Sequence, residues 1–117
     1  MIVGIGVDLV DIPRFERSLA RTPRLLQRLF SPAERVLAPH SLAARFAAKE
    51  ALIKAFGDSH DIGWHDMPVV SDVHGNPSFA LRGRAVEAAA ALGVTSLHLS
   101  MSHDAGMAVA MVLAEGA

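Results

Sequence analysis

The 117-residue sequence predicts an α+β fold, in which a mostly antiparallel sheet carries helices packed on one side. Two observations lead to this prediction. Apolar segments of strand length come in pairs separated by the turn signals "HGN" and "HDAG", and such hairpins join antiparallel strands. The segments with helical features gather between one early strand and the first hairpin, whereas a parallel sheet would alternate strand and helix.

A single domain is expected over residues 1–117, because a chain of this length is of ordinary size for one core. Its elements are predicted from apolar periodicity and turn residues. The expected order is a strand at 2–8, helices at 12–20, from Thr22 to Phe30 and at 42–56, a loop at 58–66, strands at 67–73 and 77–82, a helix at 84–92, and strands at 95–102 and 106–114.

Capping residues set the predicted helix boundaries. Asp11 is placed to cap the first helix, with Pro13 in its first turn. The motif "SPAE" (31–34) has the spacing of a capping box, which predicts the start of another helix. Ser41 is expected to cap the long alanine-rich helix at 42–56, and Gly57 suits a left-handed residue at its end.

Composition excludes several classes of protein. The net charge is −1, so no overall field attracts nucleic acid, and the absence of cysteine excludes a disulfide framework. The apolar start "MIVGIGV" is halted by Asp8 and is too short for a signal peptide or a membrane span. We therefore expect a cytoplasmic protein that binds neither nucleic acid nor membrane.

The stretch "RFAAKEALIKAFG" (45–57) mixes charged and apolar residues on one helix. A helical wheel places Arg45 and Lys49 within the same arc as the large apolar side chains, while Glu50 and Lys54 border the alanine side. A surface helix normally separates its apolar stripe from its charged face. We interpret these charges as groups that an anionic ligand and a metal ion complete.

Asp8 and Glu50 are the candidate metal ligands. Mg²⁺ in proteins commonly takes one or two carboxylates and fills its other positions with water and substrate phosphate. Each residue also has a structural alternative, because Asp8 is placed to cap a turn and Glu50 to pair with Lys54 one turn later. If the carboxylates hold a metal, Arg45, Lys49 and Lys54 are expected to face the phosphates.

Five arginines follow a helical spacing of three and four residues in the first third of the chain. Pro23 must bend this stripe over two short helices. Its two interpretations are a solvated face and a docking surface for an acidic partner, and guanidinium groups suit carboxylates and phosphates. The stripe consists of Arg14, Arg17, Arg21, Arg24 and Arg28.

Three other features carry weaker signals. His103, at a hairpin end, is either a hydrogen-bonded turn residue or a phosphate or proton-transfer group. Gly4 and Gly6 lack the third glycine of a dinucleotide fingerprint, which favours close packing or a bulge. The His and Asp residues of 60–66 match no zinc spacing, so we do not predict a metal site there.

The ordered motifs "GIGVDLVDIPRFE" (4–16), "RFAAKEALIKAFG" (45–57) and "SMSHD" (100–104) resemble the holo-acyl-carrier-protein synthases, the small bacterial class of 4′-phosphopantetheinyl transferases. "FSPAE" (30–34) and "GNP" (75–77) resemble connecting motifs of that family. The resemblance covers nearly the whole chain. It departs from the family in a short stretch between Glu34 and Arg45 and in the unusual segment "HDIGWHDM".

The resemblance implies an enzyme that transfers phosphopantetheine from coenzyme A to a serine of apo-acyl carrier protein and releases adenosine 3′,5′-bisphosphate. It implies that Asp8 and Glu50 bind Mg²⁺ on the pyrophosphate, with a metal-bound water, Glu50 or Asp8 as the base. It also implies a homotrimer with active sites at subunit interfaces, which would account for a helix that is apolar all round. The expected coenzyme A contacts are Arg45, Lys49, Lys54, Gly57, Pro77 and His103.

An acidic acyl carrier protein gives the arginine stripe a partner, with Arg14 as the first candidate contact. Fatty acid and polyketide carriers both remain open. Two other classes of function compete with the transferase. A Mg²⁺-dependent phosphohydrolase would use the same carboxylates, and a non-enzymatic nucleotide- or RNA-binding module would use the stripe. The single Trp and the absence of Tyr count against the binding module, because base stacking needs exposed aromatic rings.

Overall fold

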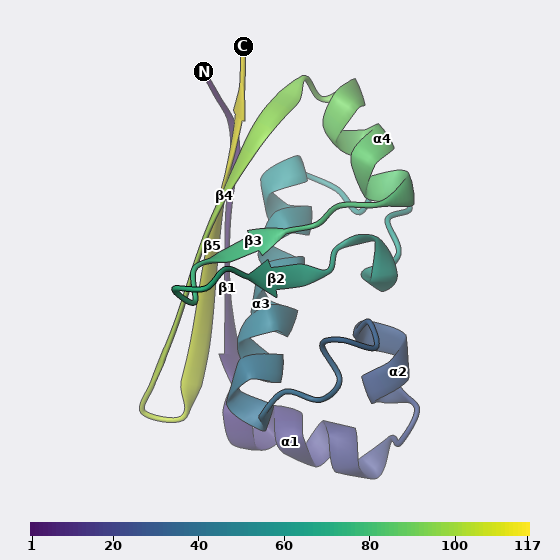
Figure 1. Ribbon diagram of the computed structural model, residues 1–117, viewed down its shortest axis with the longest axis vertical. Coiled ribbons are helices and arrows are strands. Elements are labelled where there is room, and N and C mark those ends of the chain that lie inside the picture. Colours follow the sequence, from purple (N-terminus) through teal and green to yellow (C-terminus); the bar gives the residue numbers. More distant parts are fainter.

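A computed structural model describes residues 1–117 and has the predicted α+β architecture, with an antiparallel sheet covered by helices on one face (Figure 1). The elements are β1 (Ile2–Asp11), α1 (Ile12–Arg21), α2 (Leu25–Leu29), α3 (Pro39–Phe56), the short 3₁₀ helix η1 (Trp64–Asp66), β2 (Val69–Ser71), β3 (Pro77–Phe79), α4 (Gly83–Ala91), β4 (Val94–Asp104) and β5 (Met107–Gly116). None of the helices is both long and apolar enough to cross a membrane.

The main sheet has the order β1-β5-β4, and all its neighbours are antiparallel. Strand β1 continues to Asp11, so Asp8 lies within the strand and pairs with Ala110, and the prediction that Asp8 ends the strand is wrong. The polar side chain interrupts the apolar pattern without interrupting the ladder, because it projects on the helix side of the sheet. The turn between β4 and β5 uses Ala105 and Gly106, both with positive φ.

Helix α3 packs against β1 at an unusually short distance. A Cβ built on Gly4 or on Gly6 would overlap the carbonyl oxygen of Ala55 or Ala51. These glycines therefore allow the helix backbone to touch the strand backbone, which is the close packing expected from the sequence. The pairing also shows a register shift between Ile2 and Gly4, so a strand irregularity accompanies the close contact.

The boundaries of α3 differ from the prediction at one end only. The helix ends at Gly57, whose φ of 83° is the expected left-handed conformation. It begins at Pro39 with Ala38 as the N-cap and without a side-chain cap, so the prediction that Ser41 caps it is wrong. Pro39 supplies the favourable fixed φ of a first helical position and extends the helix by one turn.

The "SPAE" segment forms turns and no helix. Its box is half formed, since Glu34 accepts from the backbone N–H of Ser31 at 3.0 Å, as a capping box requires. The Ser31 hydroxyl also donates to Glu34, at 3.2 Å, instead of accepting from the backbone. The carboxylate is turned toward the interior, where it binds Lys49, and this contact replaces the expected helix start.

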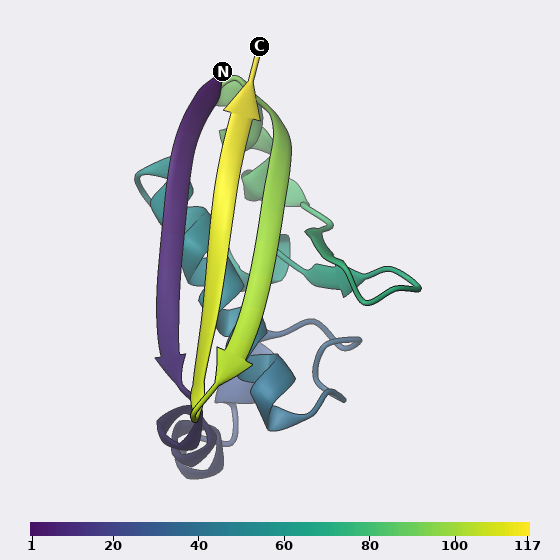
Figure 2. The same ribbon diagram turned by 90° about the vertical axis from the view of Figure 1, so that its left-hand side faces the viewer.

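Most of the surface of α3 is covered by the chain itself. One side packs on β1 and β5, and the other side is covered by the segments around α2, η1 and the β2-β3 hairpin (Figure 1). The apolar-all-round pattern therefore reflects burial inside one chain and is no evidence for a subunit interface. Figure 2 shows instead that the other face of the main sheet carries no helix.

The uncovered face of the sheet is apolar. Along β1 the residues alternate, with Gly4, Gly6 and Asp8 toward the helix side and the larger side chains outward. Their cross-strand partners on β5 belong to the same outward face. The outward side chains include Ile5, Val7, Leu9 and Met111, which are between 46% and 61% exposed.

Candidate active site

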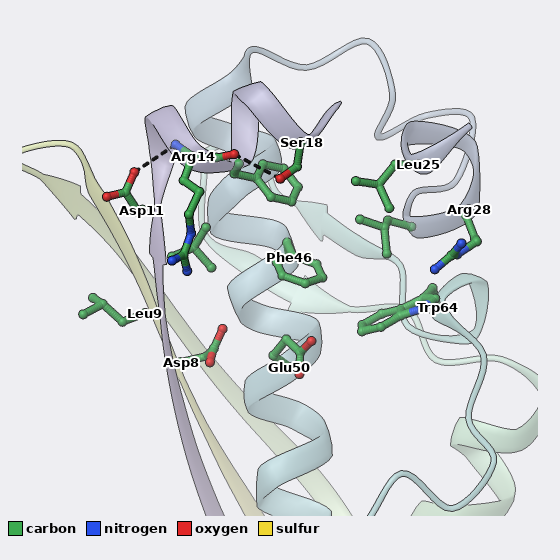
Figure 3. A pocket seen from close by; sticks show the side chains of 13 residues that line it. Asp8, Leu9, Asp11, Arg14, Ser18, Leu25, Arg28, Phe46, Glu50 and Trp64 are labelled. Carbon is green, nitrogen blue, oxygen red and sulfur yellow. Dashed lines mark hydrogen bonds between the residues drawn. The ribbon is translucent and has the colours of Figure 1, made fainter. Parts of the chain in front are cut away.

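A pocket of about 540 Å³ opens between β1, α1, α2 and α3 (Figure 3). We call it the carboxylate pocket. Asp8 and Glu50 lie at one end, and Arg14 points toward them from α1. Phe46 and Trp64 form an aromatic wall with ring centroids 5.6 Å apart. The pocket therefore combines the Asp8 and Glu50 carboxylates, a third acidic residue (Asp11), a positive rim and an apolar wall.

The fold brings Asp8 and Glu50 into the same pocket although 42 residues separate them in the sequence. The close contact of Gly6 with Ala51 places the next inward residue of β1 beside the helix turn that carries Glu50. Glu50 accepts no hydrogen bond in this structure. Burial of its carboxylate and the neighbouring negative charge of Asp8 raise the pKa of Glu50, while Lys54 partly offsets this effect.

Lys54 approaches Asp8 from the helix side. Its ammonium donates to the Asp8 carboxylate at 3.1 Å and to the backbone carbonyl of Val7 at 3.0 Å. The side chain is 54% exposed, so the pair is weakly held and remains accessible to a ligand. Asp8, Glu50 and Lys54 are thus the predicted site residues that one chain brings together.

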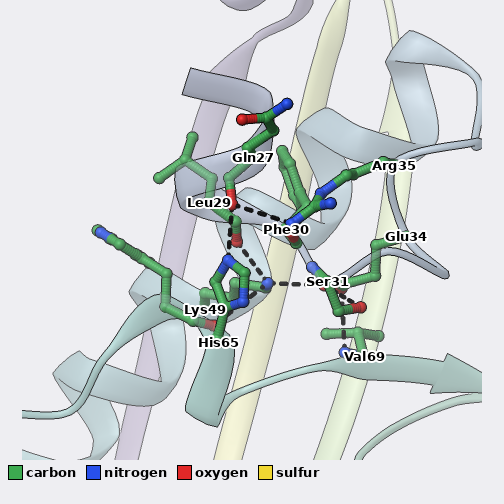
Figure 4. A network of polar contacts seen from close by, with 10 residues as sticks. Gln27, Leu29, Phe30, Ser31, Glu34, Arg35, Lys49, His65 and Val69 are labelled. Carbon is green, nitrogen blue, oxygen red and sulfur yellow. Dashed lines mark hydrogen bonds and ion pairs between the residues drawn. The ribbon is translucent and has the colours of Figure 1, made fainter. Parts of the chain in front are cut away.

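Lys49 is placed differently from the prediction. Its side chain is fully buried and its ammonium donates to Glu34 at 2.8 Å, to the Leu29 carbonyl at 2.7 Å and to the Trp64 carbonyl at 3.4 Å (Figure 4). An ammonium has three donors, and all three are engaged. Lys49 therefore cannot face a phosphate in this arrangement, and we remove it from the candidate coenzyme A contacts.

Arg45 and His103 do not line the carboxylate pocket. Arg45 is buried and donates to the hydroxyl of Ser71 at 3.1 Å, but its Nε has no partner. His103 lies beside His40 of α3, with ring centroids 4.8 Å apart. Pro77 begins β3, and Gly57 ends α3, so these predicted contacts are also distributed around the molecule.

The arginine stripe is divided by the turn between α1 and α2. Arg14 and Arg28 line the carboxylate pocket from two different helices (Figure 3). The other three arginines of the stripe are exposed and do not line it. Only two of the five arginines in the stripe therefore lie at the carboxylate pocket.

Some lining residues were not foreseen from the sequence. Phe46 was assigned to the apolar arc of the helix, and Trp64 belongs to the segment "HDIGWHDM" that had been expected to be a loop. Its unusual sequence was the available signal, since a lone Trp in a polar segment needs a packing partner. The imidazoles of His60 and His65 contact the carbonyls of Phe56 and Gln27, two separate places.

The arrangement is suited to a phosphate-bearing substrate. Two carboxylates offer the oxygen ligands that a divalent cation prefers, and Lys54 and Arg14 supply positive charge beside them. No cluster of three or more His, Cys, Asp or Glu side chains suited to a metal ion is present, so a metal here would depend on substrate and water for its other ligands. Such a combination of carboxylates and positive side chains is typical of phosphoryl-transferring enzymes.

Comparison with known proteins assigns the family within this class. The family described as the 4′-phosphopantetheinyl transferase superfamily matches residues 4–110, and the chain belongs to this family of enzymes. The holo-acyl-carrier-protein synthase of Clavibacter sepedonicus is 64% identical over 116 residues, which cover 99% of this chain and 98% of that protein. The resemblance stated from the motifs is therefore confirmed.

Solved structures agree with the assignment. The crystal structure of the holo-acyl-carrier-protein synthase from Neisseria meningitidis matches with a TM-score of 0.90 and 30% identity, over 98% of this chain and 99% of that chain. The Helicobacter pylori synthase in complex with coenzyme A matches with a TM-score of 0.84 and 33% identity, over 95% of this chain and 99% of that chain. These relatives confirm the fold class predicted from the sequence.

Proposed function

We propose that this chain transfers 4′-phosphopantetheine from coenzyme A to a serine hydroxyl of apo-acyl carrier protein and releases adenosine 3′,5′-bisphosphate. The observation that carries the proposal is the pairing of Asp8 and Glu50 in one cation-rimmed pocket. Relatives at up to 64% identity bear the name of this activity, and a solved relative binds coenzyme A. A cytoplasmic location and a role in fatty acid or polyketide synthesis belong to the same proposal.

Mg²⁺ fits the donor set of the pocket. The pKa of Glu50 is raised by burial of its carboxylate and by the negative charge of Asp8, and no hydrogen-bond donor stabilises its ionised form. A divalent cation would relieve this repulsion, with Asp8 and Glu50 as its protein ligands. When bound it would neutralise charge on the pyrophosphate of coenzyme A. Asp8 and Glu50 would then fix the position of that group, which is the main requirement in phosphoryl transfer.

Positive side chains are proposed to hold the phosphates of coenzyme A. Lys54 is exposed beside the carboxylates and can contact the pyrophosphate. Arg45 has a buried Nε without a partner, and its burial lowers the pKa of the guanidinium, so an anion placed there would stabilise it. His103 supplies an imidazole from β4, while Gly57 and Pro77 offer backbone that a nucleotide can approach closely.

These contacts are separated within one chain, which supports a site shared between copies. The apolar outer face of the main sheet offers the surface for assembly, since a patch including Ile5, Val7 and Leu9 is costly to leave in water. We propose a homotrimer built on this face. Sedimentation of the purified protein should give the mass of a trimer, and a fully active monomer at low concentration would contradict both the trimer and the shared site.

Intact-protein mass spectrometry of a carrier protein tests the proposed reaction. Incubation of apo-acyl carrier protein with coenzyme A, Mg²⁺ and this protein should increase the carrier mass by one phosphopantetheine. The Glu50→Gln variant and an EDTA-treated sample are the matched controls. Breakdown of coenzyme A with an unmodified carrier would favour the phosphohydrolase, and binding of coenzyme A with no reaction would favour the non-enzymatic module.

A further inference from the structure

Lys49 and Glu34 form the centre of a buried polar network, which we call the Lys49–Glu34 network (Figure 4). Oε1 of Glu34 accepts from the Lys49 ammonium, from the Ser31 backbone and from the Ser31 hydroxyl. Oε2 accepts from the backbone N–H of Val69 at 3.1 Å. The carboxylate therefore ties the turn after α2 to strand β2, and every partner lies inside the protein.

Lys49 extends the network to two further segments. Its ammonium donates to the Leu29 carbonyl at the end of α2 and to the Trp64 carbonyl at the start of η1. It also lies 4.9 Å from the ring centroid of Phe30. One buried ammonium thus connects α2 and η1 to the middle of α3, although the three segments are separate elements of the chain.

The two carbonyls belong to residues that form the carboxylate pocket. Leu29 and Trp64 both line it, with Trp64 on the side away from β1 (Figure 3), and Glu50, the next residue after Lys49, lines it from α3. The ammonium therefore lies directly behind the wall of the pocket. Lys49 provides hydrogen bonds that attach both α2 and η1 to α3, beside the packing of Trp64 on Phe46.

We propose that Lys49, oriented by Glu34, is a positioning residue that holds the Leu29–Trp64 wall against α3 and so shapes the pocket in which Asp8 and Glu50 act. This inference rests on the proposed transferase function. A stabilising role alone is a poor account of the pair, because a buried ion pair is generally no more stable than apolar side chains of the same volume. An apolar pair of the same volume would lack the hydrogen bonds that Lys49 donates to the two wall segments.

The test uses a variant that removes the hydrogen bonds without leaving an unpaired charge. In the double variant Glu34→Gln/Lys49→Met both charges are lost together, so no buried ion remains uncompensated. Trp64 is the only tryptophan of the chain, which makes its fluorescence a direct probe of the wall. Leu52→Ala is the matched control, because Leu52 is fully buried on the same helix and does not line the pocket.

The double variant should expose the wall and slow the reaction. We expect acrylamide quenching of Trp64 to increase about twofold, since the wall opens locally. We expect kcat for carrier modification to fall about tenfold, because small displacements of positioned groups are costly. The KM for coenzyme A should change less than about twofold, since its proposed phosphate contacts are retained. Leu52→Ala should lower the unfolding midpoint and leave quenching and kcat at the wild-type values.

A neutral double variant that still donates hydrogen bonds provides a second test. Glu34→Gln/Lys49→Gln keeps an amide at position 49, and it should restore part of the shielding and part of the rate. Unchanged Trp64 quenching in both double variants would overturn the proposal. It would also be overturned if quenching rose at wild-type kcat, or if Leu52→Ala had the same effects. If the wild type modified no carrier, the proposed function would fail, and the quenching results would still decide whether Lys49 holds the wall.

Discussion

Helix α3 carries two lysines that each pair with a carboxylate from another part of the chain, and the two pairs are built in opposite ways. Lys49 and Glu34 have side-chain exposures of 0% and 3%, and their polar atoms are saturated by internal partners. Lys54 and Asp8 have exposures of 54% and 19%, and the adjacent Glu50 has no hydrogen-bond donor. The first pair belongs to the core, and the second lies at the carboxylate pocket, where Asp8 is a lining residue.

The difference shows how a structural charge is distinguished from one that awaits a ligand. Burial of Glu34 would raise its pKa, but hydrogen bonds from Lys49, Ser31 and Val69 outweigh that effect and lower it. Burial and the charge of Asp8 raise the pKa of Glu50, and Lys54 does not fully compensate. Folding has therefore stabilised the ionised form of Glu34 and disfavoured the ionised form of Glu50 through burial and repulsion.

The largest effect on folding stability is expected from breaking the buried Lys49–Glu34 pair. Glu34→Gln leaves the Lys49 ammonium buried without a counter-charge, and we expect a loss of about 3–5 kcal/mol in the free energy of unfolding. Urea denaturation measures this loss. Glu115→Gln is the matched control, because its partner His98 is exposed and the unfolding midpoint should stay close to the wild-type value. Equal losses in the two variants would show that burial does not distinguish these pairs.

Removing either carboxylate of the Asp8 and Glu50 pair should strongly reduce activity while leaving the fold intact. We expect Asp8→Asn and Glu50→Gln each to lower kcat/KM at least about 10²-fold, or ~3 kcal/mol, because each removes a ligand of the proposed metal ion. Steady-state kinetics of carrier modification at several Mg²⁺ concentrations measure the loss. Denaturation in EDTA should show no loss of stability, because removal of either charge ends the repulsion between the carboxylates.

The double variant Asp8→Asn/Glu50→Gln sharpens this test. Residues that serve one ion are not independent, so the combined loss should be much smaller than the sum of the single losses. Additive losses would indicate two separate roles. Wild-type activity of either single variant at limiting Mg²⁺ would show that the two carboxylates do not share a metal.

Most of the fold was predictable from local patterns. The turn signal "HGN" and the capping residues Asp11 and Gly57 are confirmed, because each acts through its own neighbours: the side chain of Asp11 accepts from the N–H of Arg14, and Gly57 adopts a left-handed φ. The start of α3 and the helix expected at "SPAE" were wrong. In the second case Glu34 forms long-range contacts with Lys49 and Val69, and no local pattern contains them.

The same limit applies to the candidate site. The sequence indicated that Asp8, Glu50 and Lys54 are unusual, and they do lie together. The helical wheel placed Lys49 within the apolar arc and Lys54 at the border of the alanine side, but both were expected to face phosphates. Only tertiary packing shows that Lys49 is the one that finds a buried carboxylate. The wall residue Trp64 was missed because its partners come from α3.

A smaller effect on folding stability is expected from a change of pH. The contributions of Glu34 and Glu50 should change in opposite directions. Glu34 has a lowered pKa in the folded protein, so its contribution to stability is present above the ordinary value of 4.5 and is lost as the pH falls through and below it. Glu50 has a raised pKa, so its contribution is present below 4.5 and is lost as the pH rises through the raised value.

Variants make the two contributions visible in EDTA. The stability deficit of Glu34→Gln should stay constant from pH 7 down to 4.5 and shrink only below 4.5, where the wild type also loses the charge. Glu50→Gln should be more stable than the wild type at pH 7, and this advantage should disappear as the pH is lowered from 7 to 4.5. Urea denaturation at a series of pH values measures both differences, and parallel curves for the two variants would contradict the distinction.

The smallest effect is expected at the rim of the pocket, where charges are exposed and screened. Arg14→Glu should raise the KM for an acidic carrier protein about fivefold, or ~1 kcal/mol, with little change in the KM for coenzyme A. Arg17→Glu is the matched control, since it makes the same change of charge on the same exposed helix but does not line the pocket. Kinetics at two salt concentrations separate the two variants.

The comparison of these two arginines decides whether the rim or the whole basic surface guides the carrier. If the carrier docks over the carboxylate pocket, Arg14 lies next to the serine that must reach Asp8 and Glu50, and its replacement should have the larger effect at both salt concentrations. A general field would act through charge alone, so both variants would then raise the KM equally and the increase would vanish in high salt. Only the first outcome supports docking at the pocket rim.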